Sequence, residues 1–279
     1  MIDDYKSLGI GIFAYNRPSH LRRVLISLEN NNVKQATIFL DGPKNKKDLV
    51  IQKEIIFMVN QNPFIRLKLI KCSKNIGLAK SILNGVKYLS KKHKNMIIIE
   101  DDCVPRAEFF KFIKDIIQTK HYKKNLNPIC GYQFPEIQKF NKKNLTPVFL
   151  KYFLPWGWCV NSNYWKKYLS FINKEKNIKI KDTIIKKIET LTKGKSKNIW
   201  SKNFIRFNLV SNKRIIFPNI SLIKNIGFDG SGVNSKITNK LSTKYVKTKN
   251  KSKLNKISSN QKLVSIQAKV LNKRLRYFF

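Results

Sequence analysis

Acidic residues are scarce in this chain of 279 residues, which has 16 Asp and Glu against 57 Lys and Arg and a formal net charge of +41. Such a charge bears on partners and solubility rather than on fold. It has three open explanations: a general bias toward Lys, Asn and Ile, attraction to an anionic membrane surface, and neutralisation of nucleic-acid phosphates. The Lys residues are spread along the chain without a recognisable nucleic-acid module, so nucleic acid is the least expected partner.

Cysteines and long apolar runs are also few. The four cysteines are far apart and form no CxxC pair, so neither a zinc site nor a disulfide framework is expected. No apolar run approaches the roughly 20 residues that a membrane-spanning helix needs. The start, Met1–Tyr5, lacks the layout of a signal peptide. We therefore expect a cytoplasmic protein, with peripheral binding to the inner face of the membrane left open.

Several nucleotide and hydrolase motifs are absent. There is no GxGxxG and no GxxxxGK[ST], which disfavours dinucleotide and P-loop chemistry. There is no GxSxG, and three scattered histidines indicate no catalytic triad. Hydrophobic residues make up 42% of the chain, enough at this length to bury a core and to exclude wholesale disorder.

Strand and helix patterns alternate through the first half. Apolar runs predict strands at 8–15, 36–40, 65–70 and 96–99, and helical spacing predicts helices at 21–28, 49–59, 76–89 and 109–117. The second half is less regular, with helices expected at 163–171, 182–191 and 200–210 and strands at 214–217 and 220–223. The alternation predicts an α/β fold with an open, mostly parallel sheet flanked by helices. Ligands of such sheets bind beyond the carboxyl ends of the strands.

Three adjacent acids, Glu100, Asp101 and Asp102, stand at one of these strand ends. Adjacent carboxylates repel each other unless a cation or hydrogen-bond donors compensate. Oxygen ligands suit Mg²⁺ or Mn²⁺, which can bridge a carboxylate to phosphate oxygens. Alternatively, Asp102 begins the next helix, where the helix dipole favours an acid. Spacing alone leaves both interpretations open.

Six motifs, in this order and spacing, resemble glycosyltransferases of the GT-A fold, in particular family 2-like bacterial sugar transferases akin to the N-acetylglucosaminyltransferase I type. The motifs are Phe13–Pro18, Leu40–Gly42, Lys74–Gly77, Glu100–Asp102, Pro155–Trp158 and Pro218–Gly232. The resemblance covers about residues 8 to 234. It implies a hexosyl- or N-acetylhexosaminyltransferase that uses Mn²⁺ or Mg²⁺. The sugar would move with inversion from a nucleotide donor, a UDP-sugar being favoured, to a surface glycan or glycolipid.

The resemblance also implies roles for residues by position. The nucleotide-sugar site would be formed by Ala14, Tyr15, Arg17, Asp41, Asn75, Glu100 and Asp101. Asp102 would ligate the metal ion. The cleft between donor and acceptor would be lined by Trp156, Gly157, Trp158, Gly230 and Ser231. The two tryptophans have a second interpretation as core residues, whereas stacking on a sugar face would use their large rings.

The catalytic base is the point of departure from the family. Ser201 stands where the relatives have a base Asp, and a serine is no carboxylate base. Asp229 and Asp182 are the weak replacements, although a turn is the favoured interpretation of Asp229 and a helix start that of Asp182. Two alternative functions follow: an impaired relative that binds a sugar nucleotide or a glycan without transfer, and a basic nucleic-acid-binding protein.

The sequence divides into a transferase domain at 1–234 and a basic extension at 235–279. Within the domain, 1–125 would be the nucleotide-binding half and 126–234 the acceptor-side half. The extension has 13 Lys and Arg and no acid. Its apolar residues recur at helical spacing: Val264, Ala268, Leu271, Leu275 and Phe278. Such a helix would lie on an anionic membrane or pack on the domain, and both remain open.

Overall fold

A computed structural model describes residues 8–140, 145–174, 180–193, 200–231, 237–243 and 257–275. The first half alternates strands and helices as predicted. Its elements are β1 (Leu8–Ala14), α1 (Pro18–Asn30), β2 (Gln35–Leu40), α2 (Lys46–Asn60), β3 (Arg66–Lys71), α3 (Leu78–Ser90) and β4 (Asn95–Glu100). The third helix begins two residues later than predicted because Gly77, at φ +80°, forms its N-cap.

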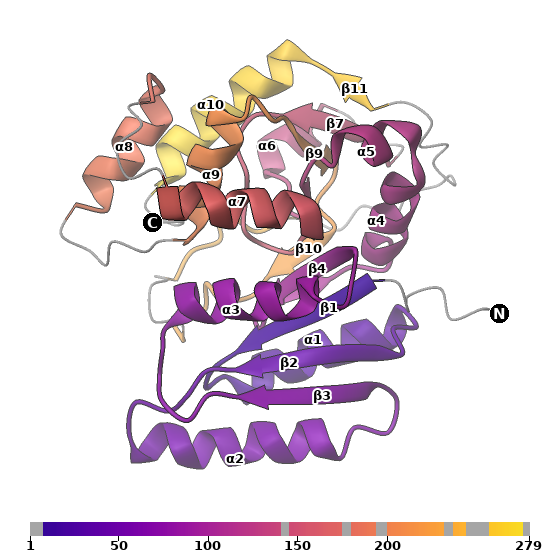
Figure 1. Cartoon of the computed structure of the whole chain (residues 1–279), viewed down its shortest axis with the longest axis vertical. Helices are drawn as coiled ribbons and strands as arrows, with labels where there is room; N and C mark the ends of the chain where they lie inside the picture. Colours follow the sequence, from indigo (N-terminus) through magenta and orange to yellow (C-terminus); the bar gives the residue numbers. More distant parts are fainter. Residues whose placement is uncertain are drawn as a thin grey trace.

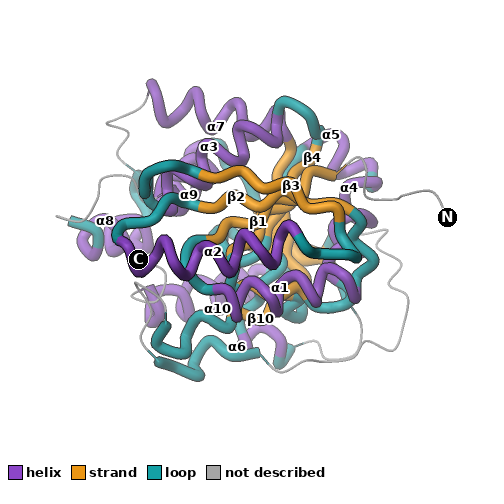
Figure 2. The backbone as a smooth tube through the Cα atoms, turned by 90° about the horizontal axis from the view of Figure 1, so that it is seen from below, coloured by secondary structure: helices purple, strands orange, loops and turns teal. Residues whose placement is uncertain are grey.

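These four strands form a parallel sheet in the order β3-β2-β1-β4 (Figure 1). Ile12 of β1 pairs with Ile38 of β2 on one side and with Ile99 of β4 on the other. All seven residues of β1 are buried, as expected for a central strand covered on both faces. Helix α3 covers one face of the sheet, and α1 and α2 cover the other (Figure 2).

The second half extends the same sheet. Its elements are β5 (Cys103–Pro105), α4 (Phe109–Gln118), α5 (Lys120–Asn125), β6 (Ile129–Cys130), α6 (Pro135–Gln138), β7 (Pro147–Leu150), β8 (Trp158–Asn161), α7 (Ser162–Lys174), α8 (Thr183–Leu191), α9 (Trp200–Val210), β9 (Ile215–Pro218), β10 (Ile223–Asn225), β11 (Ser258–Ser259) and α10 (Gln261–Arg274). The sheet continues from β4 in the order β8-β6-β9-β7-β11, with β8 antiparallel to β4. The predicted open, mostly parallel α/β sheet is confirmed, and the antiparallel pairs of β8 with β4 and β6 and of β7 with β9 make it a mixed sheet.

The strand predicted at 220–223 is wrong. Residues 220–222 are a buried connection, in which the Leu222 N–H donates to the Gly131 carbonyl at 2.8 Å. The strand begins at Ile223 and pairs antiparallel with β5, in a two-stranded sheet of its own. The apolar run at 220–222 therefore indicates a buried segment and not a paired strand. Sequence periodicity alone does not distinguish a buried strand from another kind of buried segment.

Helix α10, in the basic extension, packs on the domain. It contacts α6, α8 and β7, and β11 adds to the sheet beside β7 (Figure 1). Gln267 is fully buried, donates to the Tyr152 carbonyl at 2.8 Å and accepts from the N–H groups of Lys151 and Tyr152. Leu271 and Leu275 of the predicted apolar face are buried against the domain, which favours packing on the domain over a membrane-binding face. Phe278 and the predicted boundary at 234/235 lie outside the described residues.

Among the described residues, no helix is both long and apolar enough to cross a membrane.

Replacing Leu271 should show that the extension stabilises the domain. Leu271 has no exposed area, so Leu271→Ala should lower the free energy of unfolding by about 2–5 kcal/mol through lost burial and a cavity. Urea denaturation measures the change. Lys269→Ala, at an exposed position of the same helix, is the control and should change it by less than about 0.5 kcal/mol. Equal, small effects of both changes would contradict the packed arrangement.

Candidate functional site

A pocket of about 300 Å³ lies at the carboxyl ends of β1, β2 and β4. It brings together most of the residues predicted for the nucleotide-sugar site and the cleft: Ala14, Tyr15, Arg17, Asp41, Asn75, Glu100, Asp101, Trp156 and Ser231. The predicted residues that do not line it are Asp102, Gly157, Trp158 and Gly230. The chain segments concerned are far apart in sequence and meet because the strands are parallel and neighbouring.

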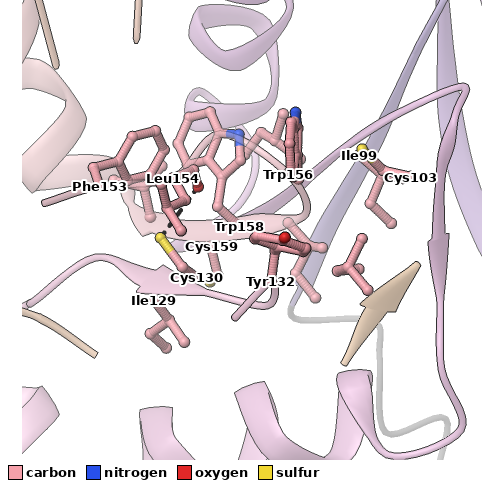
Figure 3. Close-up of a cluster of buried hydrophobic side chains, with 14 of the residues drawn as sticks. Ile99, Cys103, Ile129, Cys130, Tyr132, Phe153, Leu154, Trp156, Trp158 and Cys159 are labelled. Carbon is pink, nitrogen blue, oxygen red and sulfur yellow. Dashed lines mark hydrogen bonds between the residues drawn. The ribbon is translucent and has the colours of Figure 1, made fainter. Parts of the chain in front are cut away.

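The two tryptophans have different environments, although one residue separates them. Trp158 is fully buried and lies in a cluster of buried side chains (Figure 3). It stacks on Trp200 with 5.1 Å between ring centroids, so its predicted place in the cleft is wrong and the core interpretation holds. Trp156 packs edge-to-face on Tyr132 and Phe228 and lines the pocket. Gly157, at φ +61°, makes the turn between them.

Asp41 is saturated by donors from its own chain. Its carboxylate accepts from the N–H groups of Gly42, Ile76 and Gly77 at 2.8–2.9 Å and from the Asn75 amide at 3.1 Å. These bonds hold the turn that leads into α3 against the end of β2. The carboxylate thus organises the pocket wall, which leaves it little capacity for the predicted contact with a uracil.

A second acid that was not predicted, Asp48, holds two pocket-lining residues, Tyr15 and Asn16. Asp48 accepts from the Tyr15 hydroxyl, from the Asn16 amide at 2.9 Å and from the Lys44 N–H at 3.0 Å. The Tyr15 hydrogen bond is the main reason why the pKa of Asp48 is lowered. Burial, followed by this hydrogen bond, raises the pKa of Tyr15 to about 12. The ring and backbone of the β1 end are therefore fixed before any ligand binds.

Among the pocket-lining residues that were not predicted, Lys44 and Ser81 carry polar groups whose surroundings matter for a ligand. Lys44 lines the pocket, and its ammonium lies 5.4 Å from the centroid of the Tyr15 ring. Ser81, in the first turn of α3, lines the pocket too, and its buried hydroxyl has no hydrogen-bond partner among the described residues. A buried hydroxyl without a partner is unfavourable unless a ligand or water satisfies it. Only the tertiary fold reveals either residue, because neither belongs to a motif.

Arg17 joins the end of β1 to the acidic triplet at the end of β4. Its guanidinium Nη2 contacts the Asp101 carboxylate and lies 2.9 Å from Asp102 Oδ2. All three side chains are largely buried, with 18, 4 and 13% of their areas exposed. Arg17 is also the N-cap residue of α1, and Pro18 lies in the first turn of that helix. The N-terminus of α1 therefore begins beside the residue that binds the acidic triplet.

The triplet does not carry three full negative charges near neutral pH. Burial, then Asp102 and Asp101, raise the pKa of Glu100 to about 8, and Arg17 only partly opposes this. Burial raises the pKa of Asp101 to about 6, although Arg17 lowers it. The repulsion expected from the sequence is thus relieved in two ways, by a shared guanidinium and by protonation.

The predicted metal-ligand role of Asp102 does not fit this arrangement. One carboxylate oxygen of Asp102 contacts Arg17, and the other accepts from the Cys103 thiol at 3.3 Å. In the described part of the chain, no group of three or more His, Cys, Asp or Glu residues is placed to hold a metal ion. The carboxylate predicted to bind Mn²⁺ or Mg²⁺ is therefore already paired and does not line the pocket.

The residues considered for the catalytic base are not free carboxylates in the pocket. Ser201 is buried in α9 and does not line the pocket. Asp182 caps α8 through the N–H groups of Ile184 and Ile185, as the helix-start interpretation predicted. Asp229 accepts from Ser231, as the turn interpretation predicted, and its carboxylate lies 3.1 Å from His20 Nε2.

Comparisons with known proteins give fold likenesses only. No protein-family model matches the chain, and no curated protein matches it. The mannosyltransferase PcManGT from Pyrobaculum calidifontis, solved with GDP-Man and Mn²⁺, is similar at 8% identity and a TM-score of 0.42, over 60% of this chain and 46% of that one. This chain therefore spans less than half the length of that enzyme.

Two more solved structures are similar at the same low level. HddC from Yersinia pseudotuberculosis, complexed with GMP-PN, matches at 13% identity over 59% of this chain and 86% of its own, with a TM-score of 0.35. A197 from STIV matches at 8% identity over 77% of this chain and 83% of its own, with a TM-score of 0.38. Sequence identities and TM-scores this low show nothing about the activity of this chain.

The structural role of Asp182 is testable through pH. Its carboxylate also accepts from Lys151 at 2.7 Å and Tyr152 at 3.0 Å. Burial alone would raise the pKa of Asp182, but these hydrogen bonds and that from Ile185 lower it. Its stabilisation is therefore present above the ordinary carboxylate range and is lost as pH falls through the lowered folded-state pKa.

Asp182→Ala should thus lower the free energy of unfolding by about 1–2 kcal/mol at neutral pH, and the deficit should shrink under acid conditions. Urea denaturation at several pH values measures the difference. A stable variant whose only defect is lost transferase activity would instead favour Asp182 as the base.

Proposed function

We propose that this chain is a glycosyltransferase that takes a sugar from a nucleoside diphosphate sugar. The observation that carries the proposal is the composition of the pocket at the carboxyl ends of the parallel strands. Arg17 and Lys44 supply positive charge, Glu100 and Asp101 supply carboxyl groups, and Trp156 supplies an aromatic ring. The described residues thus bring two cations, two acids and an aromatic ring together in one pocket.

Each part of the pocket suits one part of such a donor. A guanidinium forms strong, charge-assisted hydrogen bonds with phosphate oxygens. Carboxyl groups and the unpaired Ser81 hydroxyl suit the hydroxyls of ribose and sugar. The ring of Trp156, which is buried at 6% exposure but lines the pocket, suits an apolar sugar face. UDP remains the favoured nucleotide through the sequence resemblance, as does a glycan or glycolipid as acceptor.

Arg17 and Lys44 would stabilise the charge that develops on the departing diphosphate while an acceptor hydroxyl attacks the anomeric carbon from the opposite side. The acceptor proton needs a base. Asp229 is poorly suited, because its hydrogen bonds from Ser231 lower its pKa and weaken it as a proton acceptor.

A second candidate function is binding of a sugar nucleotide or glycan without transfer. It is favoured by Ser201, which is buried outside the pocket lining, and by the structural engagement of Asp182. Release of nucleoside diphosphate from UDP-sugars in the presence of acceptor glycans separates the two functions: release supports transfer, whereas binding without release supports the second candidate.

Nucleotide binding is the direct test of the pocket. Isothermal calorimetry with UDP and GDP should show binding to the intact chain, and Lys44→Met should weaken it by about tenfold through loss of a charge near the phosphates. Lys47→Met is the matched control, because Lys47 is exposed on α2 and does not line the pocket. No binding of either nucleotide, or equal losses in both variants, would contradict the proposal.

A further inference from the structure

We infer that Arg17 is the built-in cation of this site, so that the pocket binds a diphosphate without a divalent metal ion. The inference rests on the proposed function for the identity of the ligand. Its physical basis is separate: a permanent positive charge already occupies the position, between carboxylates and pocket, where a metal ion would be needed. Arginine keeps this charge at every physiological pH.

The first argument is the pairing of Arg17. One guanidinium nitrogen, Nη2, contacts carboxylate oxygens of both Asp101 and Asp102. A metal ion bound at this position would likewise hold the two adjacent carboxylates together. Removing the guanidinium would leave the two carboxylates buried and uncompensated, which is strongly unfavourable.

The second argument is the closure around Asp102. Ile226 donates its N–H to the Asp102 carbonyl at 2.8 Å, which places Gly227 directly over the carboxylate. A Cβ atom on Gly227 would lie 2.2 Å from Asp102 Oδ2 and 3.1 Å from Arg17 Nη1. Mg²⁺ needs near-octahedral coordination and usually keeps several waters. The backbone over Asp102 leaves no room for such a shell while Arg17 stays in place.

The third argument is the order of the groups. Arg17 lines the pocket and Asp102 does not, so a ligand in the pocket meets the guanidinium before it meets that carboxylate. A guanidinium carries five N–H donors, and two carboxylates do not exhaust them. The remaining donors suit phosphate oxygens, and the start of α1, at the same place, favours an anion through its dipole. Asp101 and Asp102 are therefore positioning residues for Arg17.

The decisive experiment titrates Mn²⁺ alone, followed by electron paramagnetic resonance of the free ion. The intact chain should leave Mn²⁺ free, whereas Arg17→Ala should gain a Mn²⁺ site, because the loss of the guanidinium frees carboxylate oxygens. Arg17→Gln serves in the same way if the alanine variant does not fold. Arg22→Ala is the matched control on α1, since exposed Arg22 pairs only with exposed Glu54 among the described residues, and it should gain no site.

Stoichiometric Mn²⁺ binding to the intact chain that is lost in Asp102→Asn would overturn the inference. So would folded Arg17 variants that gain no Mn²⁺ site. This titration needs no nucleotide, so it decides the role of Arg17 even if the proposed function fails.

A second readout uses UDP. Its affinity for the intact chain should be the same with EDTA as with Mn²⁺, and Arg17→Lys, which keeps the charge but loses the planar fork, should weaken it by about tenfold. Affinity that disappears with EDTA would contradict a built-in cation. Absence of UDP and GDP binding under both conditions would count against the proposed function. The Mn²⁺ titration would then decide by itself whether Arg17 takes the place of a metal ion.

Discussion

A single guanidinium makes it possible for this fold to place three acids in a row at the end of a central strand. Arg17 leaves the end of β1 and contacts Asp101 and Asp102 at the end of the neighbouring strand β4. Parallel pairing of the two strands fixes the distance between these ends. The loop at Ile226 and Gly227 then lies over the Asp102 carboxylate. The sheet, the first helix and the second half of the chain thus meet at one ion cluster.

Two of the few acids in this chain, Asp41 and Asp48, hold the backbone and side chains around the pocket in place. Asp41 holds the turn before α3, and Asp48 holds Tyr15 and Asn16. Each accepts several hydrogen bonds, as buried carboxylates must if they are not to destabilise the fold. What faces the ligand is therefore a wall whose charges are balanced internally, with Arg17 and Lys44 added. Such preorganisation limits the reorganisation that ligand binding would require.

Local patterns were sufficient to predict the four parallel strands of the first half, β9 and most helices, because periodicity reports burial and each βαβ unit has one favoured hand. The short strands β6, β7, β8 and β11, which complete the sheet, were not predicted. The same patterns also predicted that Arg17, Asp41 and Glu100 lie together at the edge of the sheet formed by the carboxyl ends of the strands. The partners of these residues could not be predicted, because Asp101 is 84 residues from Arg17 and Asp48 is 33 from Tyr15.

Two residues of the acidic triplet and the cleft have surroundings that local sequence does not show. Nothing in the local sequence around Asp102 shows that Arg17 and Gly227 lie against its carboxylate. Trp158 was assigned to the cleft since nothing local shows that Trp200 packs on it. Likewise, an apolar pattern on α10 did not reveal the buried Gln267, whose hydrogen bonds fix that helix to the domain. In each instance a long-range contact decides the role of a residue whose type alone is ambiguous.

The central claim concerns what neutralises the acidic triplet when a ligand is bound. The most direct measurement is a crystal structure of the intact chain grown with Mn²⁺ and UDP, with diffraction recorded at the manganese absorption edge. The account predicts that Arg17 keeps both contacts, that UDP phosphate oxygens approach the guanidinium, and that no anomalous peak lies beside Asp102. A manganese peak bonded to Asp102, with Arg17 displaced, would contradict it.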